Sequence, residues 1–162
     1  LALLSNPALL IADEPTTNLD VTIQAQVLSL IKELRENTGA AILLITHSLG
    51  IVAWLCDKVS VMYAGKIVEQ ADTRSIFKNP MHPYTQLLLK SIPKINAPKG
   101  KLDTIDGEVP NLIESPTGCR FHPRCPYSKN VCTKEEPPLI ESESGHFSSC
   151  HIHSYKGWDE LK

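Results

Sequence analysis

Residues 9–20, LLIADEPTTNLD, run from four apolar residues directly into two adjacent carboxylates, Asp13 and Glu14. A continuous apolar run that ends in turn residues predicts a strand buried on both faces, as in a parallel sheet. Open α/β sheets bind ligands at the carboxyl ends of such strands. One carboxylate could hold Mg²⁺ while the other orients or deprotonates a water that attacks a phosphate. The alternative is an acidic strand end that only caps a helix.

The residues after this stretch predict a long helix. Apolar residues recur at three- and four-residue steps through residues 21–37. Asp20 or Thr22 can cap the start of the helix, and Gly39 lies just past its end. The pattern therefore predicts a strand followed by a helix.

A second apolar run, AAILLIT at residues 40–46, predicts a second buried strand. His47 follows this strand as Asp13 follows the first, and Ser48 can cap a helix over residues 49–55. Two apolar strands joined by a helix are typical of an α/β fold with a parallel sheet. A histidine at a strand end is either a structural group or a ligand-contacting one.

The next segment changes its periodicity. Residues 59–63 and 66–70 alternate around a turn that contains Gly65, and they predict an antiparallel hairpin. We expect this hairpin to form the last two strands of the sheet. Helices are predicted over residues 72–77 and 83–91, and residues 93–118, rich in proline and glycine, predict a linker.

Four cysteines gather after the linker. Cys119, Cys125, Cys132 and Cys150 are spaced C-x5-C-x6-C-x17-C, which is not the C-x2-C pair of most zinc knuckles. So short a segment needs a cross-link, and the candidates are Zn²⁺, a [4Fe–4S] cluster or two disulfides. Cys56 lies among apolar residues, and we expect it to pack as a small hydrophobe.

Composition limits the possible functions. The chain has 162 residues, is 42% hydrophobic and has a net charge of −2. This charge predicts no general affinity for nucleic acid or anionic membranes. No apolar run approaches the roughly 20 residues of a membrane span. Five cysteines are too few to indicate a disulfide-rich secreted chain, so the composition is consistent with a reducing, cytosolic setting.

Several motifs resemble one family. LLIADEPTTNLD resembles the Walker B motif and D-loop of an ATP-binding-cassette (ABC) ATPase, and LLITHS resembles its switch-histidine strand. NPMHPYTQLLLKSIP and GCRFHPRC resemble the C-terminal region of the ATPase subunits of oligopeptide and dipeptide importers. The resemblance covers roughly residues 1–152. It implies a partial P-loop NTPase core with parallel strands, followed by a small irregular Cys-rich module.

The resemblance implies roles for four residues of the core. Asp13 would reach Mg²⁺ through water, and Glu14 would be the catalytic base. His47 would contact the γ-phosphate of ATP, and Asp20 would belong to the D-loop that meets the Walker A region of a second ATPase subunit.

The resemblance also favours a [4Fe–4S] cluster on the four cysteines, although spacing alone does not choose it over zinc. His122, His146 and His151 are second-choice ligands, chiefly for zinc. His82, in the HPYT segment, is a family marker to which we assign no chemistry.

The motifs predict four segments: residues 1–92 from the nucleotide-binding domain, a linker at 93–118, a cysteine module at 119–153 and a tail at 154–162. The sequence contains no Walker A motif, so we expect the C-terminal part of a longer ATPase, inactive by itself. Its expected partners are a second ATPase subunit, two transmembrane permease subunits and, indirectly, an extracytoplasmic peptide-binding protein.

The expected location is the cytoplasmic face of the cell membrane. Three alternatives stay open: a subunit for nickel or glutathione import, an ABC ATPase acting on DNA or chromosomes, and a metal- or cluster-binding interaction module without ATPase activity.

Overall fold

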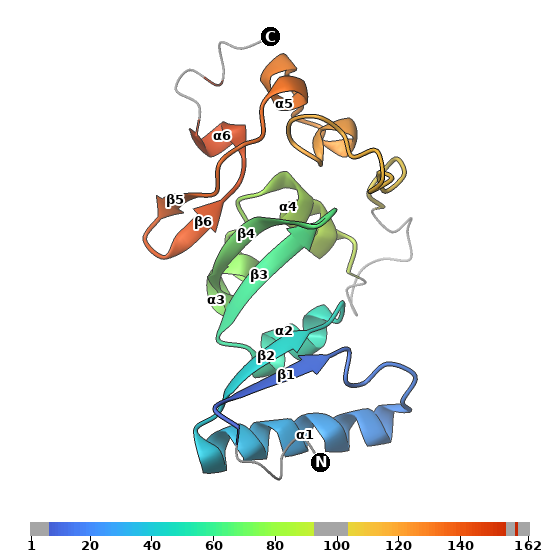
Figure 1. Cartoon of the computed structure of the whole chain (residues 1–162), viewed down its shortest axis with the longest axis vertical. Coiled ribbons are helices and arrows are strands. Elements are labelled where there is room, and N and C mark those ends of the chain that lie inside the picture. The colour runs from blue at the N-terminus through green and yellow to red at the C-terminus, as the bar shows by residue number, and fades with distance from the viewer. Residues whose placement is uncertain (1–6, 93–103, 155–157, 159–162) are drawn as a thin grey trace. The chain divides into compact units, whose positions relative to one another are not determined.

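The computed structural model describes residues 7–92, 104–154 and 158. The chain divides into two compact units, Leu1–Cys56 and Asp57–Lys162 (Figure 1). The helix end predicted for residues 1–5 lies outside the described residues. Among the helices that the structure describes, none has the length and apolar character needed to cross a membrane.

The first unit contains the predicted parallel strands. Strand β1, Leu9–Asp13, pairs in parallel with β2, Ala41–Ile45, from Leu9 opposite Ala41 to Asp13 opposite Ile45. Helix α1, Val21–Thr38, connects the two strands. The α/β character and the helix predicted between the strands are therefore confirmed.

Both ends of α1 are capped as the sequence predicts. Asp20 Oδ1 accepts the N–H groups of Thr22 and Ile23 at 2.9 and 3.0 Å. Gly39 has a φ of 68°, and its N–H donates to the Arg35 carbonyl at 3.0 Å. These bonds satisfy backbone groups that an α-helix leaves without partners at its ends.

Helix α2, Leu49–Leu55, begins and ends where predicted, but its expected cap is absent. Ser48 occupies the N-cap position and its side chain makes no capping bond. Its N–H donates instead to Thr46 Oγ1 at 3.1 Å. Cys56, half-buried, follows as the C-cap residue.

One face of the β1–β2 pair is covered, and the other is open. Leu28 and Ile31 of α1 and Ile51 and Leu55 of α2 form a core with Ile42 and Leu44 of β2. The prediction of strands buried on both faces is wrong for this chain, because the alternate side chains lack a covering layer. Those exposed side chains are Leu9 at 52%, Ile11 at 59%, Leu43 at 50% and Ile45 at 46%.

The second unit is built on an antiparallel sheet in the order β3–β4–β6–β5 (Figure 1). The predicted hairpin is confirmed as β3, Lys58–Tyr63, and β4, Lys66–Asp72. Its predicted place at the end of the parallel sheet is wrong. β4 pairs instead with β6, His146–Ser148, which pairs with β5, Ile140–Glu143.

Short helices surround this sheet. The helices are α3 (Thr73–Lys78), α4 (Pro83–Lys90), the 3₁₀ turn η1 (His122–Arg124), α5 (Asn130–Lys134) and α6 (His151–Ser154). Asp72 caps the first of these helices, α3, by accepting the Ser75 N–H at 3.0 Å. In the described part of the predicted linker, residues 104–118, there is no helix or strand.

An aromatic core joins the hairpin to the cysteine segment. Phe121, 1% exposed, packs against Tyr63 and Tyr84 with ring centroids 5.1 and 5.4 Å away. Cys119 and Cys125 lie against the same core. The four segments expected from the sequence stay a prediction; the boundary between the two compact units lies between residues 56 and 57 of the chain.

The open face of β1–β2 predicts self-association of the chain. Apolar sheet surface left in water favours contact with another chain. The average molar mass of the isolated chain in solution should therefore increase with concentration. Replacing Ile11 and Leu43 with threonine should reduce this increase. Light scattering over a concentration series measures it, with Ile113→Thr, at a side chain 91% exposed, as the control. A wild-type chain that stays monomeric throughout would contradict this prediction.

Gly118 predicts a sharp difference between two glycine substitutions. Its φ is +67°, and an added Cβ would lie 2.4 Å from the Cys132 carbonyl oxygen. Gly118→Ala should therefore destabilise the second unit by more than the roughly 1–2 kcal/mol of backbone strain alone. Gly145, with a φ of +71° and no atom within 4 Å of an added Cβ, provides the matched control. Urea unfolding compares them, and equal effects would refute the steric argument.

Candidate functional site

The parallel register of the first unit brings two predicted site residues to one edge. Asp13 lies opposite Ile45, so Glu14 and His47 both follow the carboxyl ends of neighbouring strands. The Glu14 N–H donates to the Ile45 carbonyl at 2.8 Å and extends the strand ladder by one bond. Glu14 has a φ of 43°, a conformation rare outside glycine and often found at functional sites.

Glu14 and His47 are in direct contact. Glu14 Oε1 lies 3.1 Å from His47 Nδ1, and Glu14 Oε2 accepts the Thr17 hydroxyl at 2.7 Å. The Thr17 hydrogen bond and, next, the His47 contact lower the pKa of Glu14. Glu14 is therefore an ionised carboxylate near neutral pH, held from both oxygens and able to accept a proton. Thr17 was not singled out in the sequence, although its place three residues after Glu14 in a turn is a usable signal.

The other two predicted core residues lie differently. The carboxylate of Asp13 is exposed and contacts no partner among the described residues, which leaves its oxygens available to a cation. The carboxylate of Asp20 is engaged as the cap of α1. The structure therefore brings Glu14 into contact with His47, while Asp20 caps α1 and Asp13 precedes Glu14 at the end of β1.

The four predicted cysteines line one region of the second unit. Cys119 and Cys125 flank η1, Cys132 lies on α5, and Cys150 lies between β6 and α6. All four line one cavity. The Cys119 N–H donates to the Cys132 carbonyl at 2.8 Å, which ties two of the segments together.

The cysteines are free thiols in a poorly solvated setting. Burial raises the pKa of Cys119, that of Cys125 to about 11 and that of Cys150 to about 12, and the neighbouring cysteines add to each rise. Thiols of this kind ionise when a cation compensates the thiolate charge. The donor set therefore suits a thiolate-binding metal.

The arrangement of the thiols is not that of a completed metal site. Within residues 7–92 and 104–154, no three His, Cys, Asp or Glu side chains are placed to hold a metal ion. The cavity offers only about 10 Å³ to a water-sized occupant. Ligation would therefore require the cysteine side chains to turn toward a common point.

The histidines separate into two groups. His122 and His151 line the cysteine cavity, and His122 Nδ1 lies 2.9 Å from the Cys119 carbonyl oxygen. His146 does not line the cavity. Its Nε2 instead contacts Glu69 Oε1 at 2.7 Å, so its expected availability as a substitute ligand is not supported. His82, to which no chemistry was assigned, does line the cavity.

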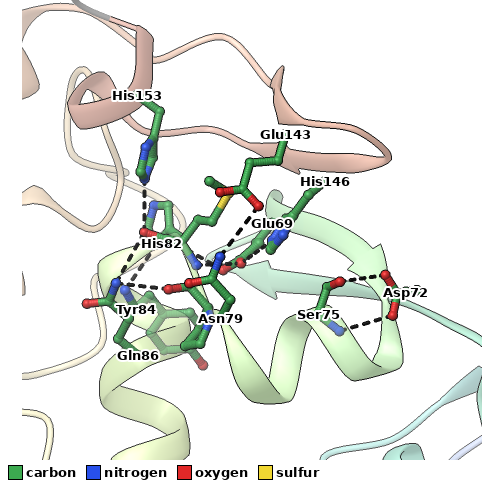
Figure 2. Close-up of polar contacts among 12 residues, drawn as sticks. Glu69, Asp72, Ser75, Asn79, His82, Tyr84, Gln86, Glu143, His146 and His153 are labelled. Carbon is green, nitrogen blue, oxygen red and sulfur yellow. Dashed lines mark hydrogen bonds and ion pairs between the residues drawn. The ribbon is translucent and has the colours of Figure 1, made fainter.

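Glu69 of β4 holds this region together, although its side chain is completely buried. Its carboxylate accepts the backbone N–H groups of Met81 and His82 at 2.7 and 3.0 Å and contacts His146 (Figure 2). A buried carboxylate is stable only when such donors surround it. No local pattern in the sequence indicates this role of Glu69, because the groups that donate to it come from distant segments.

Two family models match the sequence. The family described as "Oligopeptide/dipeptide transporter, C-terminal region" matches residues 68–132. The family described as "AAA domain, putative AbiEii toxin, Type IV TA system" matches residues 1–53.

Several curated relatives match nearly all of the chain. The oligopeptide transport ATP-binding protein AppD of Bacillus subtilis is 49% identical over 99% of this chain and 49% of its own length. The oligopeptide transport ATP-binding protein OppD of Salmonella typhimurium is 47% identical over 93% of this chain and 44% of its own length. The dipeptide transport ATP-binding protein DppD of Escherichia coli is 48% identical over 93% of this chain and 46% of its own length.

The chain spans about half the length of the curated relatives it matches. Among solved structures, cbiO1 of Clostridium perfringens, part of the ABC transporter complex cbiONQ, is 34% identical with a TM-score of 0.41, over 45% of this chain and 29% of that one. The resemblance seen in the sequence motifs is confirmed by the relatives: the close homologues of this chain are ATP-binding proteins of oligopeptide and dipeptide ABC transporters.

Proposed function

We propose that this chain is part of an ATPase subunit that hydrolyses ATP to drive the import of oligopeptides or dipeptides across the cytoplasmic membrane. The contact between Glu14 and His47 at the joined ends of β1 and β2 carries this proposal. A base beside a second polar group at a strand end suits phosphoryl transfer, which depends on positioning and electrostatics. The names of the relatives support the substrate class, and nickel or glutathione import remains the alternative.

Each residue of the edge has a distinct proposed role. Glu14 accepts a proton from the attacking water, and Thr17 holds its carboxylate in place. His47 contacts the γ-phosphate. Asp13 holds Mg²⁺ through water with its exposed oxygens, and Asp20 orders the loop that faces a second ATPase subunit.

The proposed assembly places the chain at the cytoplasmic face of the membrane. It would work with a second ATPase subunit, two transmembrane permease subunits and, indirectly, an extracytoplasmic peptide-binding protein. We propose no nucleic-acid partner, since the chain has a net charge of −2.

A second role rests on the cysteine cavity. We propose that Cys119, Cys125, Cys132 and Cys150 hold a [4Fe–4S] cluster, with Zn²⁺ as the alternative, and that the bound group cross-links the cysteine segments. Four thiols around one cavity, two of them buried and two half-buried, support a thiolate-bound group. The cysteine side chains must rotate inward for ligation, because their described positions do not form a ligand set. Cys56 lies in the other compact unit and takes no part.

Glu14→Gln tests the ATPase role in the full-length subunit assembled with its partners. The amide keeps the shape of the side chain and loses the base, so hydrolysis should fall by roughly 10²–10⁴-fold while ATP still binds. Steady-state phosphate release and nucleotide binding measure the two effects. Glu33→Gln, at an exposed position of α1, makes the same charge change as a control.

Two further measurements sharpen this test. His47→Ala should also slow hydrolysis, and the 162-residue chain alone should hydrolyse no ATP above background, since it has no Walker A motif. Wild-type turnover in both variants would refute the assignment. Activity of the isolated chain that Glu14→Gln abolishes would refute its expected inactivity.

Iron content tests the role of the cysteines. Chain purified without oxygen should contain iron and acid-labile sulfide, and each Cys→Ser change among the four should lower both. Cys56→Ser should leave both unchanged. Metal analysis of the anaerobic samples makes the comparison, and stoichiometric zinc without iron would replace the cluster by a zinc site.

A further inference from the structure

His82 lies against the cysteine cavity, and its position is fixed by several contacts. Its side chain is 1% exposed, and its ring centroid is 5.9 Å from that of Phe121. Its backbone N–H donates to Glu69 Oε2 at 3.0 Å (Figure 2). The backbone bond fixes the main chain at His82, and the ring cannot turn away from the cavity without losing its packing against Phe121.

The hydrogen bond at one ring nitrogen determines where the proton of His82 lies. The Tyr84 N–H donates to His82 Nδ1 at 3.0 Å, at the start of α4. Nδ1 therefore carries a lone pair, and in the neutral ring the proton lies on Nε2. Burial lowers the pKa of His82 to about 4, so the ring is neutral near pH 7. Metal ligation through Nε2 would need the opposite tautomer, which Tyr84 excludes.

The Nε2–H group of His82 is a buried donor without an acceptor. Among the residues that the structure describes, no atom accepts a hydrogen bond from it. The backbone of Ser149 lies near the ring and raises the pKa of His82, yet it does not meet hydrogen-bonding geometry with Nε2. An unsatisfied buried donor is unfavourable and calls for a partner.

The other two histidines of the cavity have different hydrogen-bonding states. His122 Nδ1 faces the Cys119 carbonyl and must donate to it, and His151 Nε2 likewise donates to the Glu135 carbonyl at 2.9 Å. In the neutral ring, each is left with an unprotonated second nitrogen. Of the three, His82 is the one whose hydrogen bonds leave it an N–H to donate near the thiols.

We propose that His82 Nε2–H donates a hydrogen bond to a cysteine sulfur once that sulfur ligates a metal group in the cavity. This inference rests on the proposed cluster. Ligation turns a neutral thiol into a thiolate, which is a better acceptor, and places it in the cavity that His82 lines. His82 is then a positioning and tuning residue of the cysteine site, not a ligand. Hydrogen bonds to the sulfurs are among the factors that set the potential of iron–sulfur clusters.

His82→Asn tests this inference, because asparagine can still accept the Tyr84 N–H but cannot reach the place of Nε2. The full chain is reconstituted without oxygen from ferrous iron and sulfide, and iron content and midpoint potential are measured. The variant should bind iron as the wild type does. Its midpoint potential should be lower, because the hydrogen bond from His82 stabilises the reduced cluster and the variant lacks it. His153→Asn is the control, because His153 contacts the Met81 carbonyl outside the cavity.

The outcomes separate this inference from the proposed cluster. Equal potentials in iron-loaded wild type and His82→Asn would overturn the inference and leave the cluster intact. A wild-type chain that binds neither iron nor zinc would overturn both. If His82→Asn loses iron, His82→Gln, which can present an amide donor farther out, should restore it, and failure despite a native circular dichroism spectrum would overturn the inference.

A zinc-bound wild type would refute the cluster and leave a direct test of His82. An N–H donor withdraws electron density from a thiolate, so removing it should speed alkylation of the zinc-bound cysteines by iodoacetamide. His82→Asn should then react faster than both wild type and His153→Asn, and equal rates would overturn the inference.

Discussion

The buried carboxylate of Glu69 is the constraint on which the second unit depends. It is removed from water, and its donors are the Met81 and His82 backbone N–H groups and the His146 ring. Removing any of these would leave a buried acceptor without compensation. Through these contacts β4 fixes both the loop before α4 and strand β6, which leads directly to Cys150. The geometry of the cysteine cavity is therefore set from outside the cysteine segment.

The first unit depends on a different constraint, the parallel register of β1 and β2. Because the carboxyl ends of parallel strands meet at one edge, 33 residues of separation in sequence become a 3.1 Å contact between Glu14 and His47. The Glu14 N–H bond to the Ile45 carbonyl holds the residue in its unusual conformation. A polar pair at a strand end thus follows from strand pairing, and Thr17 and the neighbouring turn complete it.

Local signals in the sequence were sufficient to predict most helices and strands and the residues of the Glu14–His47 edge. The Asp20 cap, Gly39 and the apolar periodicity predicted α1 within one residue, because helix ends and periods are set by near neighbours. The pairing of β4 with β6 was not predictable, since strand partners are set by distant segments. For the same reason the sequence did not point to Glu69, and it marked His82 without indicating that this residue lines the cysteine cavity.

The position of Phe121 shows how the cysteine segment is tied to the hairpin sheet. A short segment rich in proline and charge cannot bury enough apolar surface to fold alone. Here it places Phe121 among Tyr63 and Tyr84 and adds β5 and β6 to the hairpin sheet. The hairpin thus supplies the core that the cysteine segment lacks, and the cysteines need only close the loops around it. A metal group at the cavity would therefore act on an already positioned set of loops, so its loss should loosen the cysteine segment before it unfolds the sheet.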